Sequence, residues 1–170
     1  LLCPSCKVPA TISEEVLGTL HIKPQELEGA SIFREVGCEK CRPGYLRELR
    51  AAAASVSASL CADCQRKVHT NPLRIFDCKV ETCQELARRF PEITDYLCAE
   101  CEDNFRRFRS YLGLYKLSHR VEPRLVRGID YYTRVTFEII SSKLGAQNSI
   151  LGGGRYDNLM KDIGGPDICA

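Results

Sequence analysis

Residues 125–133 constrain the fold of this chain more than any other stretch. Their sequence is Leu-Val-Arg-Gly-Ile-Asp-Tyr-Tyr-Thr, and apolar and polar side chains alternate through residues 134–140. A period of two is typical of a β-strand, and a strand that begins at Tyr131 puts Tyr131 and Tyr132 on opposite faces. We therefore expect one tyrosine to face a ligand and the other to pack against the layer behind it.

A glycine-rich segment at residues 152–154 is the second constraint, and it continues as Arg-Tyr-Asp. We expect a short returning strand over residues 147–151 and a turn at the glycines, where a missing side chain allows a ligand or another backbone to approach closely. A helix is expected next, because four apolar positions follow helical spacing: Tyr156, Leu159, Met160 and Ile163. Together these elements predict one wall of a pocket.

These two segments resemble the two histidine-binding signatures of histidyl-tRNA synthetase, a class II aminoacyl-tRNA synthetase. The resemblance extends upstream through residues 71–79 and covers roughly residues 60–170, with Ile129 where the family usually has leucine. It implies a histidine–tRNA ligase that activates histidine with ATP and magnesium and transfers it to tRNA. It also implies a homodimer.

The same resemblance implies roles for four residues. Arg127 would be catalytic and would hold the carboxylate of histidine and the α-phosphate of ATP, while Tyr131, Tyr132 and Tyr156 would shape the substrate pocket. The chemistry fits these roles, since a guanidinium holds two oxygens at once and offsets charge that develops at phosphorus. Tyrosine offers an apolar face and a hydroxyl to an imidazole ring. The alternative is an ordinary strand with packed tyrosines and a solvated arginine.

The chain has eleven cysteines, and eight of them form four Cys-x-x-Cys pairs. This spacing suits a tetrahedral metal ion better than a disulfide framework, and zinc is the ion expected in a reducing compartment. The sequence has neither an apolar run long enough to span a bilayer nor a secretory start. We therefore expect a cytoplasmic protein without membrane insertion.

The first two pairs predict one zinc site formed by Cys3, Cys6, Cys38 and Cys41. The unit that they enclose is too small to bury much apolar surface, so a metal ion would supply its stability. The alternatives are buried free cysteines or accidental spacing. Residues 2–46 resemble the tetracysteine zinc element near the C-terminus of type II secretion and type IV pilus assembly ATPases. However, a glycine of that pattern is missing after Leu46, and the chain has no ATP-binding phosphate loop.

Six further cysteines lie within residues 61–101, although one zinc ion needs only four ligands. We expect Cys61, Cys64, Cys98 and Cys101 to form the second site, because each Cys-x-x-Cys pair makes a tight knuckle. Cys78 and Cys83 remain competitors. Buried, reduced cysteines are the alternative to a metal site.

The last helix before the strand motif is predicted from an apolar stripe: Cys101, Phe105, Phe108 and Leu112. Arg106, Arg107 and Arg109 fall largely on its other sides. By resemblance they would lie near the acceptor stem of tRNA and could contact its phosphates, whereas a solvated helix face is the alternative.

Taken together, the sequence predicts an α+β chain in four parts. These are a zinc-knuckle unit at 1–48, a linker or helical spacer at 49–60, a cysteine-containing insertion at 61–124 and a partial histidine-binding region with an antiparallel sheet at 125–170. The chain starts without Met and lacks other class II motifs, so we expect an incomplete synthetase that is inactive alone. The alternative function is a structural zinc module of a secretion or pilus ATPase that carries the synthetase part passively.

Overall fold

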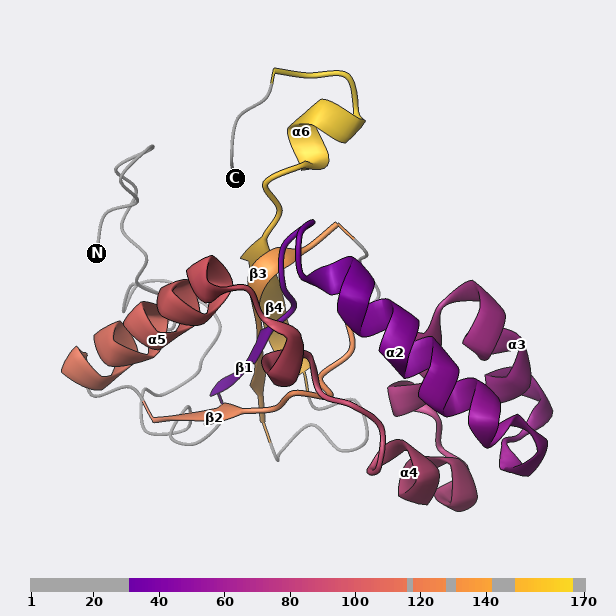
Figure 1. Ribbon diagram of the computed structural model, residues 1–170. Helices are drawn as coiled ribbons and strands as arrows, with labels where there is room; N and C mark the ends of the chain where they lie inside the picture. The colour runs from indigo at the N-terminus through magenta and orange to yellow at the C-terminus, as the bar shows by residue number, and fades with distance from the viewer. Residues whose placement is uncertain (1–30, 116–117, 128–130, 142–148, 167–170) are drawn as a thin grey trace.

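The computed structural model describes residues 31–115, 118–127, 131–141 and 149–166 (Figure 1). Its centre is a sheet with the strand order β2-β1-β3-β4. The strands are β1 (Ser31–Glu35), β2 (His119–Val121), β3 (Thr133–Ile140) and β4 (Ser149–Arg155). The expected antiparallel pairing is confirmed for β3 with β4 and also joins β1 to β3. Strands β1 and β2 lie outside the region of that prediction, and they run parallel because a long helical crossover joins them.

That crossover contains four α-helices and three short 3-10 turns. The helices are α2 (Arg42–Ser55), α3 (Ala62–Thr70), α4 (Glu81–Ala87) and α5 (Ala99–Leu114). The turns are η2 (Ser57–Ser59), η3 (Pro72–Asp77) and η4 (Ile93–Tyr96). Within the described residues, no helix is both long and apolar enough to cross a membrane.

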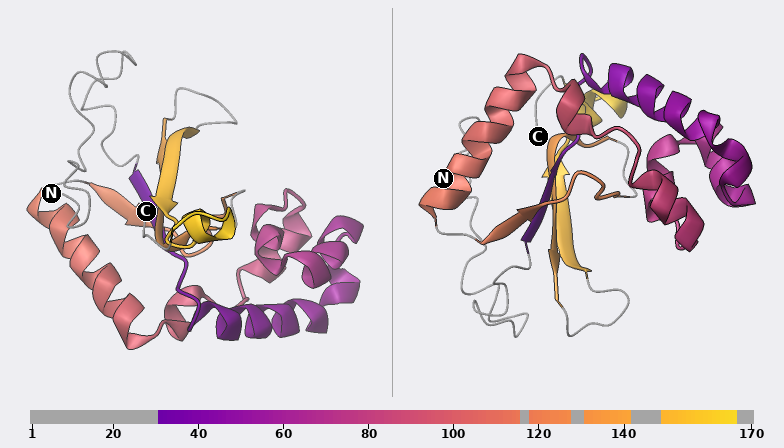
Figure 2. Two further views of the ribbon diagram at one scale, coloured as in Figure 1. Left: turned by 90° about the horizontal axis from the view of Figure 1, so that it is seen from above. Right: turned by 60° about the horizontal axis from the view of Figure 1, so that its bottom comes forward.

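The helices flank the sheet on two sides. Helices α2, α3 and α4 gather on one side, and α5 lies on the other (Figures 1 and 2). The predicted stripe on α5 is confirmed, since Cys101, Phe105 and Leu112 are buried. Phe108 meets Phe33 of β1 edge to face, with 5.1 Å between ring centroids. This aromatic contact packs α5 against the central strand.

A helical core fills the space between α2, α3, η3 and α4. Tyr45, Leu49 and Ala53 recur every four residues on α2, so they form one helix face, and all three are buried. Of residues 49–60, expected as a linker or helical spacer, residues 49–55 form the second half of α2, and the segment continues through η2 to the buried Leu60. The four consecutive alanines at residues 51–54 concealed this apolar face, because they show no helical spacing although one of them, Ala53, is buried in the core.

Residues 31–48 are built into the same body as the C-terminal half. Strand β1 pairs with both β2 and β3, and the boundary expected at residue 48 falls inside α2. Cys3 and Cys6 lie outside the described residues. The last helix of the described residues is α6 (Leu159–Asp162). Gly164 follows it with a φ of 83°, a conformation typical of the residue after a helix end.

The role of residues 49–60 in the core gives a stability prediction. Leu49→Ala removes a side chain that has 0% exposure, so it should lower the free energy of unfolding by about 2–4 kcal/mol through lost burial and a residual cavity. Leu114→Ala, on a side chain with 77% exposure, is the matched control and should cost less than about 0.5 kcal/mol. Chemical denaturation followed by circular dichroism measures both. If both substitutions lower the free energy of unfolding by the same small amount, residues 49–60 do not contribute to the core and are a linker.

Candidate binding site and cysteine clusters

Arg127 lies against strand β4 in space that a side chain at Gly152 would occupy. A Cβ atom on Gly152 would lie 2.4 Å from Arg127 Nη2. Glu138, which faces Gly152 across the β3–β4 ladder, accepts a hydrogen bond of 2.8 Å from Arg127 Nη1. The two side chains are 23% and 17% exposed. Arg127 Nε is buried without a hydrogen-bond partner, so the guanidinium is fixed along one edge and keeps donor capacity on another.

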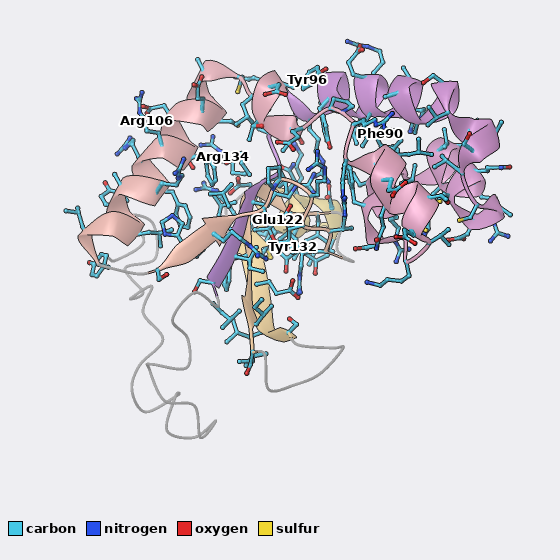
Figure 3. The ribbon with its side chains drawn as sticks, turned by 90° about the horizontal axis from the view of Figure 1, so that it is seen from below. Phe90, Tyr96, Arg106, Glu122, Tyr132 and Arg134 are labelled. Carbon is cyan, nitrogen blue, oxygen red and sulfur yellow. The ribbon has the colours of Figure 1, made fainter. Side chains whose placement is uncertain are left out.

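Tyr132 occupies the same face of the sheet. A Cβ atom on Gly154 would lie 2.8 Å from Tyr132 Cδ1, so this glycine makes room for the ring. Gly152 and Gly154 are two residues apart on one strand and therefore face the same way. Arg127 and Tyr132 line one small cavity together, and the Tyr132 side chain lies against the sheet in Figure 3.

Three tyrosine rings form a cluster at this end of the sheet. The ring centroid of Tyr132 lies 5.7 Å from that of Tyr131 and 6.3 Å from that of Tyr156, and Tyr131 and Tyr156 are 6.1 Å apart. Tyr132 is buried, whereas Tyr131 is 40% exposed. The structure thus brings together all four residues that the sequence predicted for the substrate pocket.

Two local predictions about this region are wrong. The tyrosines do not alternate across a strand, because β3 begins only at Thr133 and its regularity breaks at Arg134, which has a φ of 55°. The β3–β4 register also shifts between Thr133 and Thr136. The three glycines do not form a turn but lie within β4, where they leave space for the side chains packed on both faces.

A second cavity, of about 140 Å³, lies beside the tyrosines. One wall comes from Tyr131, Tyr132 and Thr133, and the opposite wall is the loop of residues 37–39 with Arg42. Asn158 and Asp162 complete the lining. Tyr132 and Arg42 line both cavities, so the cavity beside Arg127 and the cavity beside the loop adjoin at these two residues.

The first cysteine cluster contains Cys38 and Cys41 together with Cys98 and Cys101. Their sulfur atoms all lie within 4.8 Å of one another. The distance from Cys38 Sγ is 3.7 Å to both Cys41 Sγ and Cys98 Sγ, and Cys41 Sγ lies 3.9 Å from Cys101 Sγ. A tetrahedral zinc ion with bonds of about 2.3 Å requires sulfur atoms about 3.8 Å apart. This cluster could therefore hold a metal ion.

The second cluster contains Cys61, Cys64, Cys78 and Cys83, again within 4.8 Å of one another. Cys61 Sγ lies 3.8 Å from Cys78 Sγ, and the Cys61 N–H donates to Cys83 Sγ over 3.2 Å. The predicted grouping of Cys61 and Cys64 with Cys98 and Cys101 is thus wrong. The short turn η3 returns Cys78 and Cys83 to the start of α3, whereas Cys98 begins α5 on the other side of the molecule.

The thiols within each cluster have divergent pKa values. Burial raises the pKa of Cys38, but N–H donors from Cys41 and Lys40 outweigh it and lower the value to about 7. The backbone N–H of Cys64 is the main cause that lowers the pKa of Cys61 to about 7. Burial raises the pKa of Cys64 and Cys101. Each cluster therefore pairs a readily ionised sulfur with a buried one that needs a cation to stabilise its thiolate.

Sequence reasoning missed Glu138 as the partner of Arg127. The strand periodicity indicated that Glu138 lies on the same side as Tyr132. It could not indicate which arginine would reach Glu138, because that depends on tertiary packing. Asp157 was also missed: its carboxylate accepts a hydrogen bond from the Thr133 hydroxyl over 2.8 Å and joins the end of β4 to β3.

Comparisons with known proteins agree with this architecture. The family profile of histidyl-tRNA synthetase matches residues 30–170. Histidine–tRNA ligase from Syntrophotalea carbinolica is 47% identical over 78% of this chain and 32% of its own length. The enzyme of the same name from Oleidesulfovibrio alaskensis is 47% identical over 98% of this chain and 40% of its own length. The crystal structure of apo Staphylococcus aureus histidyl-tRNA synthetase matches 91% of this chain and 38% of its own, with 30% identity and a TM-score of 0.62.

The fold and the matched sequence define a region of a class II aminoacyl-tRNA synthetase. The chain belongs to the histidyl-tRNA synthetase family. It spans about a third of the length of the curated relatives that it matches. The family match begins at residue 30, so it also includes β1 and α2, which the sequence had assigned to a separate zinc unit.

The Arg127–Glu138 pair gives a second prediction. A double-mutant cycle with Arg127→Met and Glu138→Gln should show a favourable coupling of about 1–3 kcal/mol, because both side chains are largely buried. The same cycle on Arg66 and Asp63, whose side chains are 78% and 53% exposed, should show a smaller coupling. Urea denaturation measures both. Absence of coupling between Arg127 and Glu138 would mean that the sheet does not fix the guanidinium.

Proposed function

We propose that this chain supplies the histidine-binding wall of a histidyl-tRNA synthetase. One observation carries the proposal: Arg127 and Tyr132 pack onto the same glycine-lined face of β4, with Tyr131 and Tyr156 in ring contact beside them. This arrangement puts a fixed cation next to an aromatic, partly polar surface. An amino acid with an imidazole side chain and an acyl-phosphate group has complementary chemistry.

Arg127 would be the catalytic residue of this wall. Glu138 holds one edge of its guanidinium, and the remaining N–H groups would bind the carboxylate of histidine and then the α-phosphate of ATP. A cation that is already oriented stabilises charge on the transferring phosphorus without further rearrangement. The tyrosines would enclose the imidazole by their faces and hydroxyl groups.

The family relationship supplies the partners that we infer for the whole reaction. These are histidine, ATP with magnesium, tRNA and a second copy of the chain. Arg106, Arg107 and Arg109 are exposed on α5, and Arg106 projects from the side of α5 away from the sheet in Figure 3. They are the residues on this helix that we expect to contact tRNA phosphates.

Zinc is the ion that we infer for both cysteine clusters. Four thiolates at tetrahedral separation favour Zn²⁺, and no described acidic or histidine side chain joins either cluster. This assignment changes the ligand set predicted from the sequence for Cys38 and Cys41, since Cys98 and Cys101 lie beside them. It leaves the role of Cys3 and Cys6 as a prediction.

The synthetase role is favoured over a separate secretion-type zinc module. A separate module requires Cys38 and Cys41 to belong to a unit of their own. In the described part of the chain they follow directly on the central strand of the sheet and share a cluster with cysteines of α5.

Arg127→Ala should weaken binding of a non-hydrolysable histidyl-adenylate analogue by about 10- to 100-fold, because charge-assisted hydrogen bonds to the phosphate are lost. Binding of histidine alone should weaken less, since only the carboxylate contact is removed. Arg106→Ala, a change on the exposed outer face of α5, is the control and should leave both affinities unchanged. Isothermal titration calorimetry measures the three proteins. Equal losses for the analogue and for histidine would refute phosphate binding by Arg127.

This 170-residue stretch alone should not catalyse histidine-dependent exchange between ATP and pyrophosphate. The chain covers 32–40% of the two relatives compared above, and in-line attack requires adenine and all three phosphates to be positioned. Exchange of labelled pyrophosphate, with a full-length relative as positive control, tests this expectation. Activity above a histidine-free control that Arg127→Ala abolishes would contradict it.

A further inference from the structure

We propose that the metal ion held by Cys38, Cys41, Cys98 and Cys101 is a clasp that positions the tyrosine wall of the candidate pocket. The second cluster, although chemically equivalent, does not have this role. This proposal rests on the proposed function only in one respect, which is that it identifies the tyrosine wall as part of a histidine site. Its structural claim is that binding of the metal ion determines how well residues 36–39 and 131–134 are ordered.

The loop that carries the first two ligands is bonded directly to the start of β3. The Val36 N–H donates to Arg134 O over 2.6 Å, and the Arg134 N–H donates to Gly37 O over 3.0 Å. Arg42, one residue after Cys41, donates from Nη1 to Tyr132 O over 2.9 Å. A displacement of this loop would therefore also displace the backbone that carries Tyr132.

The side chains between the ligands continue these connections. Glu39, within the first Cys-x-x-Cys pair, accepts a hydrogen bond of 2.7 Å from Asn158 Nδ2, which follows Tyr156 on the chain. Glu100, within the second pair, forms an ion pair with Arg134. The side chain of Arg134 lies between α5 and the sheet (Figure 3). Both knuckles thus contact the segments that position the tyrosines.

The geometry of the loop also depends on the sulfur atoms. Gly37 has a φ of 75°, and a Cβ atom there would lie 3.0 Å from Cys41 Sγ. Cys38 and Cys41 precede α2, and Cys98 precedes α5, so a metal ion would join the starts of two helices that flank the sheet on different sides. Without a cation, the two knuckles are joined by sulfur–sulfur contacts of 3.7 and 3.9 Å and by an exposed ion pair between Lys40 and Glu100, all of which are weak.

The second cluster provides an internal control. Its ligands all lie within residues 61–83: Cys61 and Cys64 at the start of α3, Cys78 directly after η3 and Cys83 on α4. The hydrogen bonds of its members run to nearby residues, such as that of 3.0 Å from Gln84 Nε2 to Cys78 O. Removal of two of its thiols subtracts one metal ion without altering the hydrogen bonds of Val36 and Arg134.

The experiment compares two double variants of the chain, Cys98→Ser/Cys101→Ser and Cys78→Ser/Cys83→Ser. Elemental analysis should give about two zinc ions for the parent chain and about one for each variant. Hydrogen exchange measured by NMR should then be about tenfold or more faster at the Val36 and Arg134 amides in the first variant, because local opening becomes easier. In the second variant these two amides should exchange within about twofold of the parent rate.

A titration keeps the proposal testable if the first variant fails to fold. Zinc is added to metal-free Cys78→Ser/Cys83→Ser chain, which retains only the first cluster. Slow exchange at Val36 and Arg134 should return as one equivalent binds. Binding of zinc with no change at these amides, or no binding of zinc, would overturn the clasp.

These readouts separate the clasp from histidine recognition, because neither uses a substrate. If protection depends on zinc but the histidyl-adenylate analogue does not bind, the proposed function fails and the clasp stands. If the analogue binds but exchange at the Val36 and Arg134 amides does not depend on zinc, the clasp fails and the proposed function stands.

Discussion

The pairing of β1 with strands on both sides is the constraint on which the rest of the structure depends. Strand β1 lies between β2 and β3, so it joins the segment before the helical crossover to the segment after it. Arg34 of β1 is buried and donates a hydrogen bond of 2.5 Å to Leu125 O, which brings the start of the Arg127 segment onto the sheet. The neighbouring Glu35 is also buried, and burial raises its pKa to about 7. Polar groups of this kind are retained only where a partner fixes them, and here Gly37 N–H donates to Glu35.

On the other side of β3, the glycines of β4 also shape the site, because they lack side chains. Three consecutive glycines in a strand cost conformational entropy and provide no packing of their own. In β4 that loss is offset because Arg127, Phe137 and Tyr132 fill the space above Gly152, Gly153 and Gly154 in turn. Strand β4 therefore leaves space on one face for a cation and an aromatic ring, above Gly152 and Gly154. A substitution with any larger residue would move one of these groups.

The sequence predicted which residues come together in this region better than it predicted the backbone that carries them. The structure brings together the four residues that were named from their motifs, whose binding roles stay a prediction, and the helical stripe on α5 followed from spacing. The strand start and the glycine turn were misplaced, since the positive φ of Arg134 and the bonds of its backbone to Val36 and Gly37 arise from a contact distant in sequence. Local periodicity contains no information on such a contact. For the same reason, the sequence did not predict that β1 lies between β2 and β3 in the sheet.

The two cysteine clusters show how much of a metal site can be predicted from the spacing of cysteines in the sequence. A Cys-x-x-Cys pair defines half of a tetrahedral site, but the choice of the other half depends on which segments the fold brings together. For Cys61 and Cys64 the other half is nearby in sequence, so closing the site restricts only a short loop. For Cys38 and Cys41 it lies beyond three helices, and by analogy with a disulfide the closure of so long a loop removes about 4 kcal/mol of chain entropy from the unfolded state. The longer closure also joins β1, α2 and α5 next to the tyrosine wall, so the cluster whose partners are hardest to predict is the one with the greater influence on the candidate site.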